Sequence, residues 1–178
     1  MFTEAQQRAL VGIARDAVRG SVTGRAPGVP SAGHLPEASG AFVTLKKHGQ
    51  LRGCIGTLEC RRPLAEEVAR VAVSAAREDP RFAPVGSSEL DDLQVEVSVL
   101  GPLEPIDPLD PGAFVIGRHG LVVEQGSRRG LLLPQVATER NMDRETFLAH
   151  TCAKAGLAGD AWRKGAQVYR FAADVFGG

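Results

Sequence analysis

The stretch Leu51-Arg52-Gly53-Cys54-Ile55-Gly56-Thr57 holds the residues best suited to chemistry in this chain. In an extended strand, side chains alternate between two faces, which puts Arg52 and Cys54 together on one face. A guanidinium beside a thiol favours the thiolate, which is the reactive form. We therefore predict that Cys54 and Arg52 share a functional surface, and that Leu51 and Ile55 on the other face are buried.

Two interpretations of Cys54 remain open at this point. The neighbouring Gly53 and Gly56 leave the sulfur uncrowded, which favours a surface that binds a ligand or partner around the thiol. Free cysteines are nevertheless among the most buried residue types, and most of them are structural. The thiol is thus either a nucleophile or carrier, or a small packing residue in a strand.

A second strand supplies polar residues that can accompany the thiol. Residues 93–100 alternate between apolar and polar, with Glu96 and Ser98 on the polar face. On a neighbouring strand they would lie across from Cys54. Glu96 would then either accept a proton or pair with Arg52, and we favour the pairing with Arg52.

The sequence gives little support for a metal or a nucleotide cofactor. His150 and Cys152 stand two residues apart, a spacing that points side chains in different directions on a helix. Cys54 and Cys60 lack the short spacing of a zinc knuckle. The chain has neither a phosphate-binding loop nor a dinucleotide glycine fingerprint, and no triple-cysteine motif for an iron–sulfur cluster. We predict no metal, leave any cofactor unidentified, and exclude that this chain is itself a radical-SAM enzyme.

The composition is that of an ordinary globular chain. Of 178 residues, 43% are hydrophobic, and the 21 basic residues balance the 21 acidic ones. This neutrality argues against nucleic acid or an anionic membrane as a partner. The N-terminus lacks the pattern of a signal peptide, no apolar run approaches a membrane span, and three cysteines fit no disulfide framework. We therefore expect a cytoplasmic protein.

Hydrophobic periodicity predicts separate helices and strands rather than alternating βαβ units. Helices are expected from a capping box at Thr3 and Gln6 to Gly20, after Pro63, and after Asn141 or Asp143. This order predicts an α+β fold, with a mostly antiparallel sheet flanked by helices. We expect one domain over 1–178, with a mobile Gly/Pro-rich segment at about 20–40.

The same residues resemble a known family. The motifs Leu51-Arg52-Gly53-Cys54-Ile55-Gly56, Pro63-Leu64 and Asp79-Pro80-Arg81-Phe82 are similar to those of the AMMECR-type domain, called AmmeMemoRadiSam system protein A in microbes. The similarity continues through Glu96-Val97-Ser98-Val99-Leu100, His119-Gly120-Leu121, Leu133-Pro134-Gln135-Val136 and Lys154-Ala155-Gly156-Leu157. It spans nearly the whole chain.

The resemblance implies an α+β fold with a smaller subdomain, and an association with a Memo-like protein and a radical-SAM protein. It brings no established activity, and it adds His119 to the expected binding residues. We interpret the chain as a binding or adaptor module that presents the strand of Arg52 and Cys54. The alternative is a thiol-dependent enzyme that uses Cys54. We favour the module because thiol enzymes usually show a recognisable base.

Overall fold

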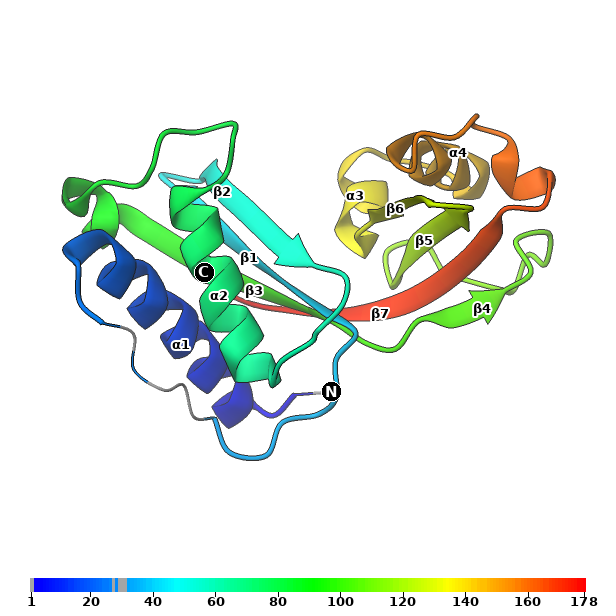
Figure 1. Cartoon of the computed structure of the whole chain (residues 1–178). Coiled ribbons are helices and arrows are strands. Elements are labelled where there is room, and N and C mark those ends of the chain that lie inside the picture. The colour runs from blue at the N-terminus through cyan, green and yellow to red at the C-terminus, as the bar shows by residue number, and fades with distance from the viewer. Residues whose placement is uncertain (1, 27, 29–31) are drawn as a thin grey trace. The chain divides into compact units, whose positions relative to one another are not determined.

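The computed structural model describes residues 2–26, 28 and 32–178, and they form two compact units. The first unit is Met1–Leu100 with Asp174–Gly178, and the second is Gly101–Ala173. Both combine antiparallel strands with helices, which confirms the predicted α+β class (Figure 1). The expectations of a single domain over 1–178 and of a mobile segment at about 20–40 stay predictions. Part of that segment lies outside the described residues.

The first helix, α1 (Glu4–Thr23), begins at the predicted capping box. The Thr3 hydroxyl accepts the Gln6 amide at 3.2 Å, and the Gln6 side chain accepts the Thr3 amide at 2.8 Å. The expected end at Gly20 is wrong, because Gly20 is buried inside the helix. Gly24 ends it instead, in the left-handed conformation with φ of 75°, and donates its amide to the Gly20 carbonyl.

The sheet of the first unit carries the candidate site. Its strands are β1 (Gly40–Lys47), β2 (Gln50–Thr57) and β3 (Leu93–Leu100), in the antiparallel order β2-β1-β3. The last residues of β7 (Gln167–Gly177) lie beside β3. A two-residue turn, with His48 and Gly49 both at positive φ, joins β1 to β2.

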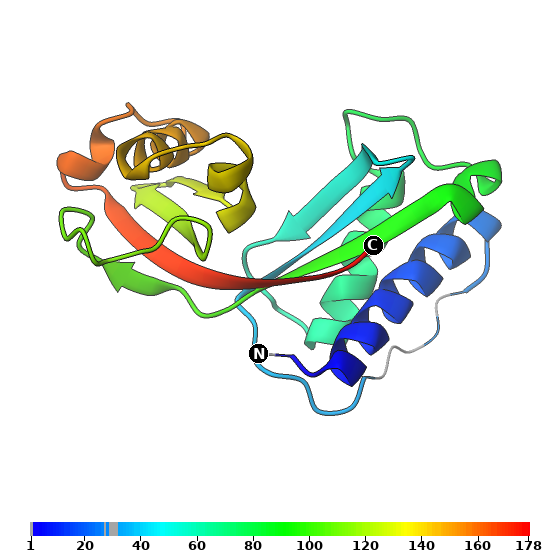
Figure 2. The ribbon, with the colours of Figure 1, turned by 180° about the vertical axis from the view of Figure 1, so that it is seen from behind.

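Both helices of the first unit cover one face of this sheet. Figures 1 and 2 show α1 and α2 (Leu64–Arg77) on the same side of β1 and β3. Inward-facing Val43, Leu45 and Val97 are fully buried beneath them, as strict alternation requires. The short helix η1 (Ser87–Asp92) then leads from α2 into β3. Among the described residues of this unit, no helix covers the opposite face of the sheet (Figures 1 and 2).

The second unit has its own sheet and core. The strands are β4 (Glu104–Ile106), β5 (His119–Gln125), β6 (Arg128–Leu132) and residues 167–173 of β7; β4 and β5 pair with β7, and β6 pairs with β5. The helices are α3 (Pro134–Glu139), α4 (Arg144–Lys154) and η2 (Ala161–Arg163). Phe147, Trp162 and Cys152 are buried in its core, so Cys152 is a packing residue.

Candidate functional site

Arg52 occupies a bulge in β2, which the sequence did not reveal. Leu45 on β1 pairs with Gly53, but the next residue, Lys46, pairs with Leu51, so Arg52 has no partner across the strand. A bulge interrupts the alternation of side chains. Leu51 is accordingly 42% exposed, and its predicted burial is wrong. Ile55, beyond the bulge, is half-buried and packs against the core.

The guanidinium of Arg52 is bound to Glu89 of η1. Its Nε and Nη2 donate to the two carboxylate oxygens of Glu89 at 3.0 and 3.1 Å, and Lys47 Nζ donates to the same carboxylate at 3.2 Å. These cations, Arg52 first, hold the pKa of Glu89 at about 2. The predicted pairing of Arg52 with Glu96 is therefore wrong. Arg52 anchors the β2 bulge to η1.

Cys54 lies in a row of polar side chains across the helix-free face. Thr44 of β1 is the partner of both Cys54 on β2 and Glu96 on β3, which places the three side chains side by side. Thr44 Oγ1 lies 3.3 Å from Cys54 Sγ, where either atom can donate. Lys46 Nζ donates to Glu96 at 3.2 Å. Lys46, Thr44, Cys54 and Glu96 are called the polar row below.

Two residues of the motif Asp79-Pro80-Arg81-Phe82 contact the Cys54 backbone directly. Asp79 accepts the backbone amide of Cys54 at 2.9 Å, and Arg81 Nη2 donates to the Cys54 carbonyl at 3.4 Å. Arg81 also binds Asp79 through Nε at 3.0 Å and Nη2 at 2.8 Å. The Arg81 side chain, together with the backbone amides of Cys54 and Arg81, lowers the pKa of the Asp79 carboxyl far below its usual range. The only signal in the sequence was the motif Asp79-Pro80-Arg81-Phe82.

The two glycines beside Cys54 are explained by packing. A Cβ on Gly53 would lie 2.2 Å from the carbonyl oxygen of Ala75 in α2, and one on Gly56 would lie 2.2 Å from the Phe42 ring. Their lack of a side chain thus lets α2 and Phe42 approach β2.

The remaining predicted binding residues, Ser98 and His119, belong to different units. Ser98 of β3 stands opposite Phe42 and is buried. His119 begins β5 in the second unit, where its Nδ1 accepts the Val115 amide at 3.0 Å. Burial, followed by the charges of Arg170 and Arg118, lowers the pKa of His119.

Neither a metal cluster nor a membrane span emerges from the described part of the chain. Among residues 2–26, 28 and 32–178, no three His, Cys, Asp or Glu side chains gather as metal ligands would. Within the same residues, no helix is both long and apolar enough to cross a bilayer.

The fold and the polar row define an α+β protein whose candidate site lies on a sheet backed by two helices. The chain belongs to the AMMECR1 family, whose model matches residues 11–176. It is 48% identical to a protein of Methanosarcina acetivorans, with 99% of this chain and 93% of that protein covered. It is 50% identical to a protein of Methanothermobacter thermautotrophicus, over 95% of this chain and 92% of the relative.

A solved structure has the same fold. The crystal structure of the uncharacterized protein PH0010 from Pyrococcus horikoshii aligns with a TM-score of 0.88 at 41% identity. The alignment covers 98% of this chain and 92% of that one. The arrangement of strands and helices described above is thus similar to that of an experimentally determined relative.

Proposed function

We propose that this protein is a binding or adaptor module, and that the polar row is its recognition surface. The observation that carries the proposal is that two carboxylates placed beside Cys54, those of Asp79 and Glu96, are already paired with basic side chains. Asp79 is bound to Arg81 and to the Cys54 amide, while Glu96 is bound to Lys46. The side-chain contact of Cys54 is the Thr44 hydroxyl, which is no general base at neutral pH.

Rigid support favours recognition by this surface. The Asp79 carboxylate fixes the outer side of β2 at Cys54, and the bidentate Arg52–Glu89 pair fixes the adjoining bulge. A surface held in one conformation loses less entropy when a partner binds. Lys46 and Glu96 remain 39% and 24% exposed, so a partner can reach this ion pair. By family resemblance, the proposed partners are a Memo-like protein and a radical-SAM protein.

A thiol-dependent enzyme is the second candidate, and Arg81 is the observation that favours it. Its guanidinium lies against the Cys54 carbonyl, and the thiolate charge would interact with it favourably. Arg81 would then take the role that we predicted for Arg52. A base would have to come from the substrate or from a partner protein.

Binding measurements with purified partners test the proposal. A purified Memo-like protein and a purified radical-SAM protein would each be titrated onto the immobilised chain. Glu96→Gln keeps the shape of the side chain but breaks the charge pair with Lys46, and it should weaken binding by about tenfold. Glu4→Gln, at an exposed acid of α1, is the control and should bind like the wild type.

Cys54→Ser separates the two candidates. Serine retains a hydrogen bond to Thr44, so an adaptor should bind its partners unchanged and support their joint activity. A thiol enzyme would bind equally well but lose turnover in the reconstituted mixture. If Glu96→Gln and the control bind alike, the polar row is not the recognition surface.

A further inference from the structure

The bulge at Arg52 turns Leu51 onto the helix-free face of the first unit. Leu51 pairs directly with Lys46 of β1, so the two side chains lie on the same face, and Lys46 belongs to the polar row. Without the added residue, strict alternation would place Leu51 on the other face, together with Ile55. Bulges beside functional sites re-aim side chains in this way.

Val175 of β7 lies on the same face as Leu51. Its neighbour Phe176 is buried in the core that the helices cover, so alternation turns Val175 to the other side of the sheet. β7 is the strand next to β3, and a Cβ on Gly177 would lie 3.3 Å from the Cα of Glu96. The polar row therefore lies between Leu51 on one side and Val175 on the other.

Both of these apolar side chains are exposed. Leu51 is 42% exposed and Val175 is 44% exposed. In the described part of the chain, the other large apolar residues that are exposed are Leu109 and Val115, which both belong to the second unit. Single exposed apolar residues are common on protein surfaces. Two on one face of a sheet, with polar groups between them, combine the apolar and polar contacts of a protein interface.

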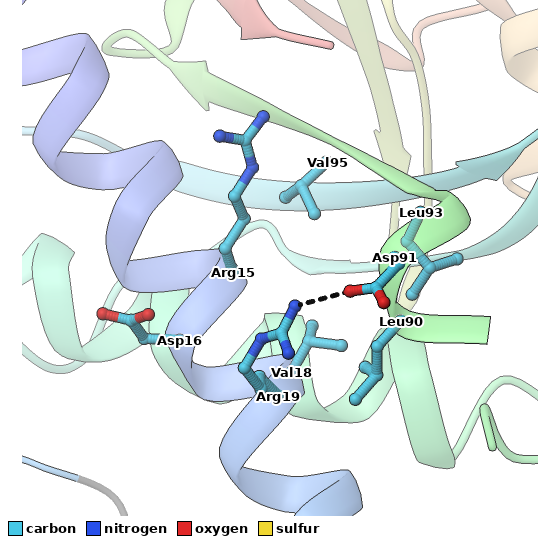
Figure 3. Close-up of a pocket in the computed structure, with 8 residues that line it drawn as sticks. All are labelled: Arg15, Asp16, Val18, Arg19, Leu90, Asp91, Leu93 and Val95. Carbon is cyan, nitrogen blue, oxygen red and sulfur yellow. Dashed lines mark hydrogen bonds and ion pairs between the residues drawn. The ribbon is translucent and has the colours of Figure 1, made fainter. Parts of the chain in front are cut away.

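A hollow on the helix-covered side of the same sheet offers less to a partner. It lies between α1 and the segment that runs from η1 into β3, and its Val18 and Val95 are each only 2% exposed (Figure 3). Arg19 at its rim is bound to Asp91 at 3.3 Å, and the guanidinium of Arg15 points away from that of Arg19. On the helix-free face, apolar surface is still in contact with water, and a partner can bury it.

The charges between the two apolar residues define the chemistry of the partner. Lys46 Nζ lies 3.2 Å from the Glu96 carboxylate, and Lys46 is on the side of Leu51. A complementary partner places an acidic group over Lys46 and a basic group over Glu96. Neighbouring strands lie about 4.8 Å apart, so the three steps from β2 to β7 separate Leu51 from Val175 by at least about 14 Å. The partner therefore needs two separate apolar residues to reach both.

We propose that Leu51 and Val175 are the two apolar anchors of the recognition surface, and that they bind a protein surface whose own two apolar side chains flank an acidic and a basic group. The inference rests on the proposed adaptor function and names the chemistry of its partner. Arg52 and Glu89 are positioning residues, because their bidentate pair at 3.0 and 3.1 Å holds the bulge that presents Leu51. An anchor held in place loses less entropy when the partner binds.

Titration with the purified Memo-like protein and the purified radical-SAM protein tests the two anchors. Leu51→Asn and Val175→Thr keep the approximate shape of each side chain but make it polar, and each should weaken binding by about tenfold. Leu109→Asn and Val115→Thr make the same changes at exposed residues of the second unit. These matched controls should bind like the wild type. All four variants should unfold at the wild-type urea concentration, because exposed side chains contribute little to stability.

A double-mutant cycle tests the positioning role of the bulge. Glu89→Gln weakens the bidentate pair, and it should lower the affinity by about threefold when Leu51 is present but leave it unchanged in the Leu51→Asn background. Arg52→Gln breaks the same pair from the other side, and it replaces Glu89→Gln if that variant does not fold. An equal loss of affinity in both backgrounds would overturn the positioning role.

Lys46→Glu tests the acidic group of the partner. The substitution puts two like charges face to face, so it should weaken binding by at least about tenfold. The loss should be larger at low salt than at high salt, because salt screens exposed charges. Wild-type affinity of Lys46→Glu would overturn the proposed order of charges.

The outcomes separate this inference from the adaptor proposal. If Glu96→Gln weakens binding but both anchor variants bind like the wild type, the anchors are overturned and the adaptor function stands. If the anchor variants weaken binding but Glu96→Gln does not, the anchors stand and the polar row is not the recognition surface. Equal weakening by the anchor variants and their controls would overturn the anchors. Failure of both proteins to bind the wild type would overturn both proposals.

Discussion

The two units bury polar groups in different ways. In the first unit, the carboxylates of Glu67 and Asp79 are almost fully buried. In the described part of the second unit, the buried polar side chain is Thr151, which donates to a carbonyl of its own helix at 2.7 Å. A buried charge destabilises the fold unless it is paired and hydrogen-bonded, so the first unit needs its arginines to be in place.

The two buried carboxylates fix particular segments of the backbone. Glu67 accepts the backbone amide of Arg61 at 3.2 Å and the Arg70 side chain at 2.9 Å, which fixes the connection after β2. Asp79 fixes β2 itself at Cys54. The second unit relies on large apolar side chains such as Phe147 and Trp162. The comparison shows that fixed charges gather around the strand that bears the candidate site.

In both units, a glycine in a strand lets the backbone of a helical segment pack closely against the sheet. Replacing this glycine should give the largest loss of stability. A Cβ on Gly53 meets the Ala75 oxygen at 2.2 Å, and one on Gly130 meets the Ala155 nitrogen at 2.2 Å. Gly53→Ala and Gly130→Ala should each lower the free energy of unfolding by about 3 kcal/mol, because backbone cannot move aside easily. Urea unfolding measures this.

Gly12→Ala is the control for these two variants. Its Cβ would meet nothing within 4 Å, and alanine favours a helix, so this variant of α1 should be as stable as the wild type or up to about 1 kcal/mol more stable. Hydrogen exchange would show which unit loosens in each case. Wild-type stability of Gly53→Ala would contradict the packing explanation for that glycine.

Removal of one buried polar group from each unit should sharpen the contrast. Asp79→Asn removes a charge that accepts bonds from Cys54 and Arg81, and it should lower stability by about 2 kcal/mol. Thr151→Val removes one local hydrogen bond and should lower it by about 1 kcal/mol. Denaturant melts compare the two. An equal loss would mean that charge burial does not distinguish the units.

The smallest effect concerns pH and His119. Burial and two arginines lower the pKa of His119 in the folded protein, so the unfolded chain binds the proton more readily. The resulting stability is complete above a pH of about 6.5 and is lost as pH falls through the lowered pKa. His119→Asn should remove this loss, as measured by thermal melts from neutral to mildly acidic pH.

The exposed His150 of the same unit provides the control for this experiment. His150→Asn should keep the pH dependence of the wild type, because its side chain lies at the surface. In the first unit, the stability that comes from the ionised Glu89 is lost only at much lower pH, because Glu89 has a pKa of about 2. A His119→Asn variant that still loses stability near pH 6 would show that another group titrates there.

Elements with strong periodicity could be predicted from the sequence. The range 93–100 predicted from the alternation matches the bounds of β3. Asp143 caps α4 as one of the two expected caps, its carboxylate accepting the Thr146 amide at 2.8 Å. These features follow from local chemistry. Side-chain period and capping geometry involve residues only a few positions apart, so a single sequence contains them.

Features set by distant residues could not be predicted. The bulge at Arg52 depends on Glu89, which lies 37 residues away, and a single added residue in a strand leaves no periodic signature. The contact between Asp79 and Cys54, which are 25 residues apart, could not be predicted for the same reason. The polar row itself was partly foreseen, because Glu96 does lie in the row of Cys54, with Thr44 between them.

Asp79 and Arg81 bind the backbone groups of Cys54 in β2, and this affects whether copies of the protein aggregate in solution. β2 is the outermost strand of its sheet, and such a strand can template pairing with another chain. At Cys54, the Asp79 carboxylate accepts the backbone amide and the Arg81 guanidinium donates to the backbone carbonyl, as the groups of a neighbouring strand would. Loss of the pair would expose these groups, and the molecule would then be prone to edge-to-edge aggregation while its core was still intact.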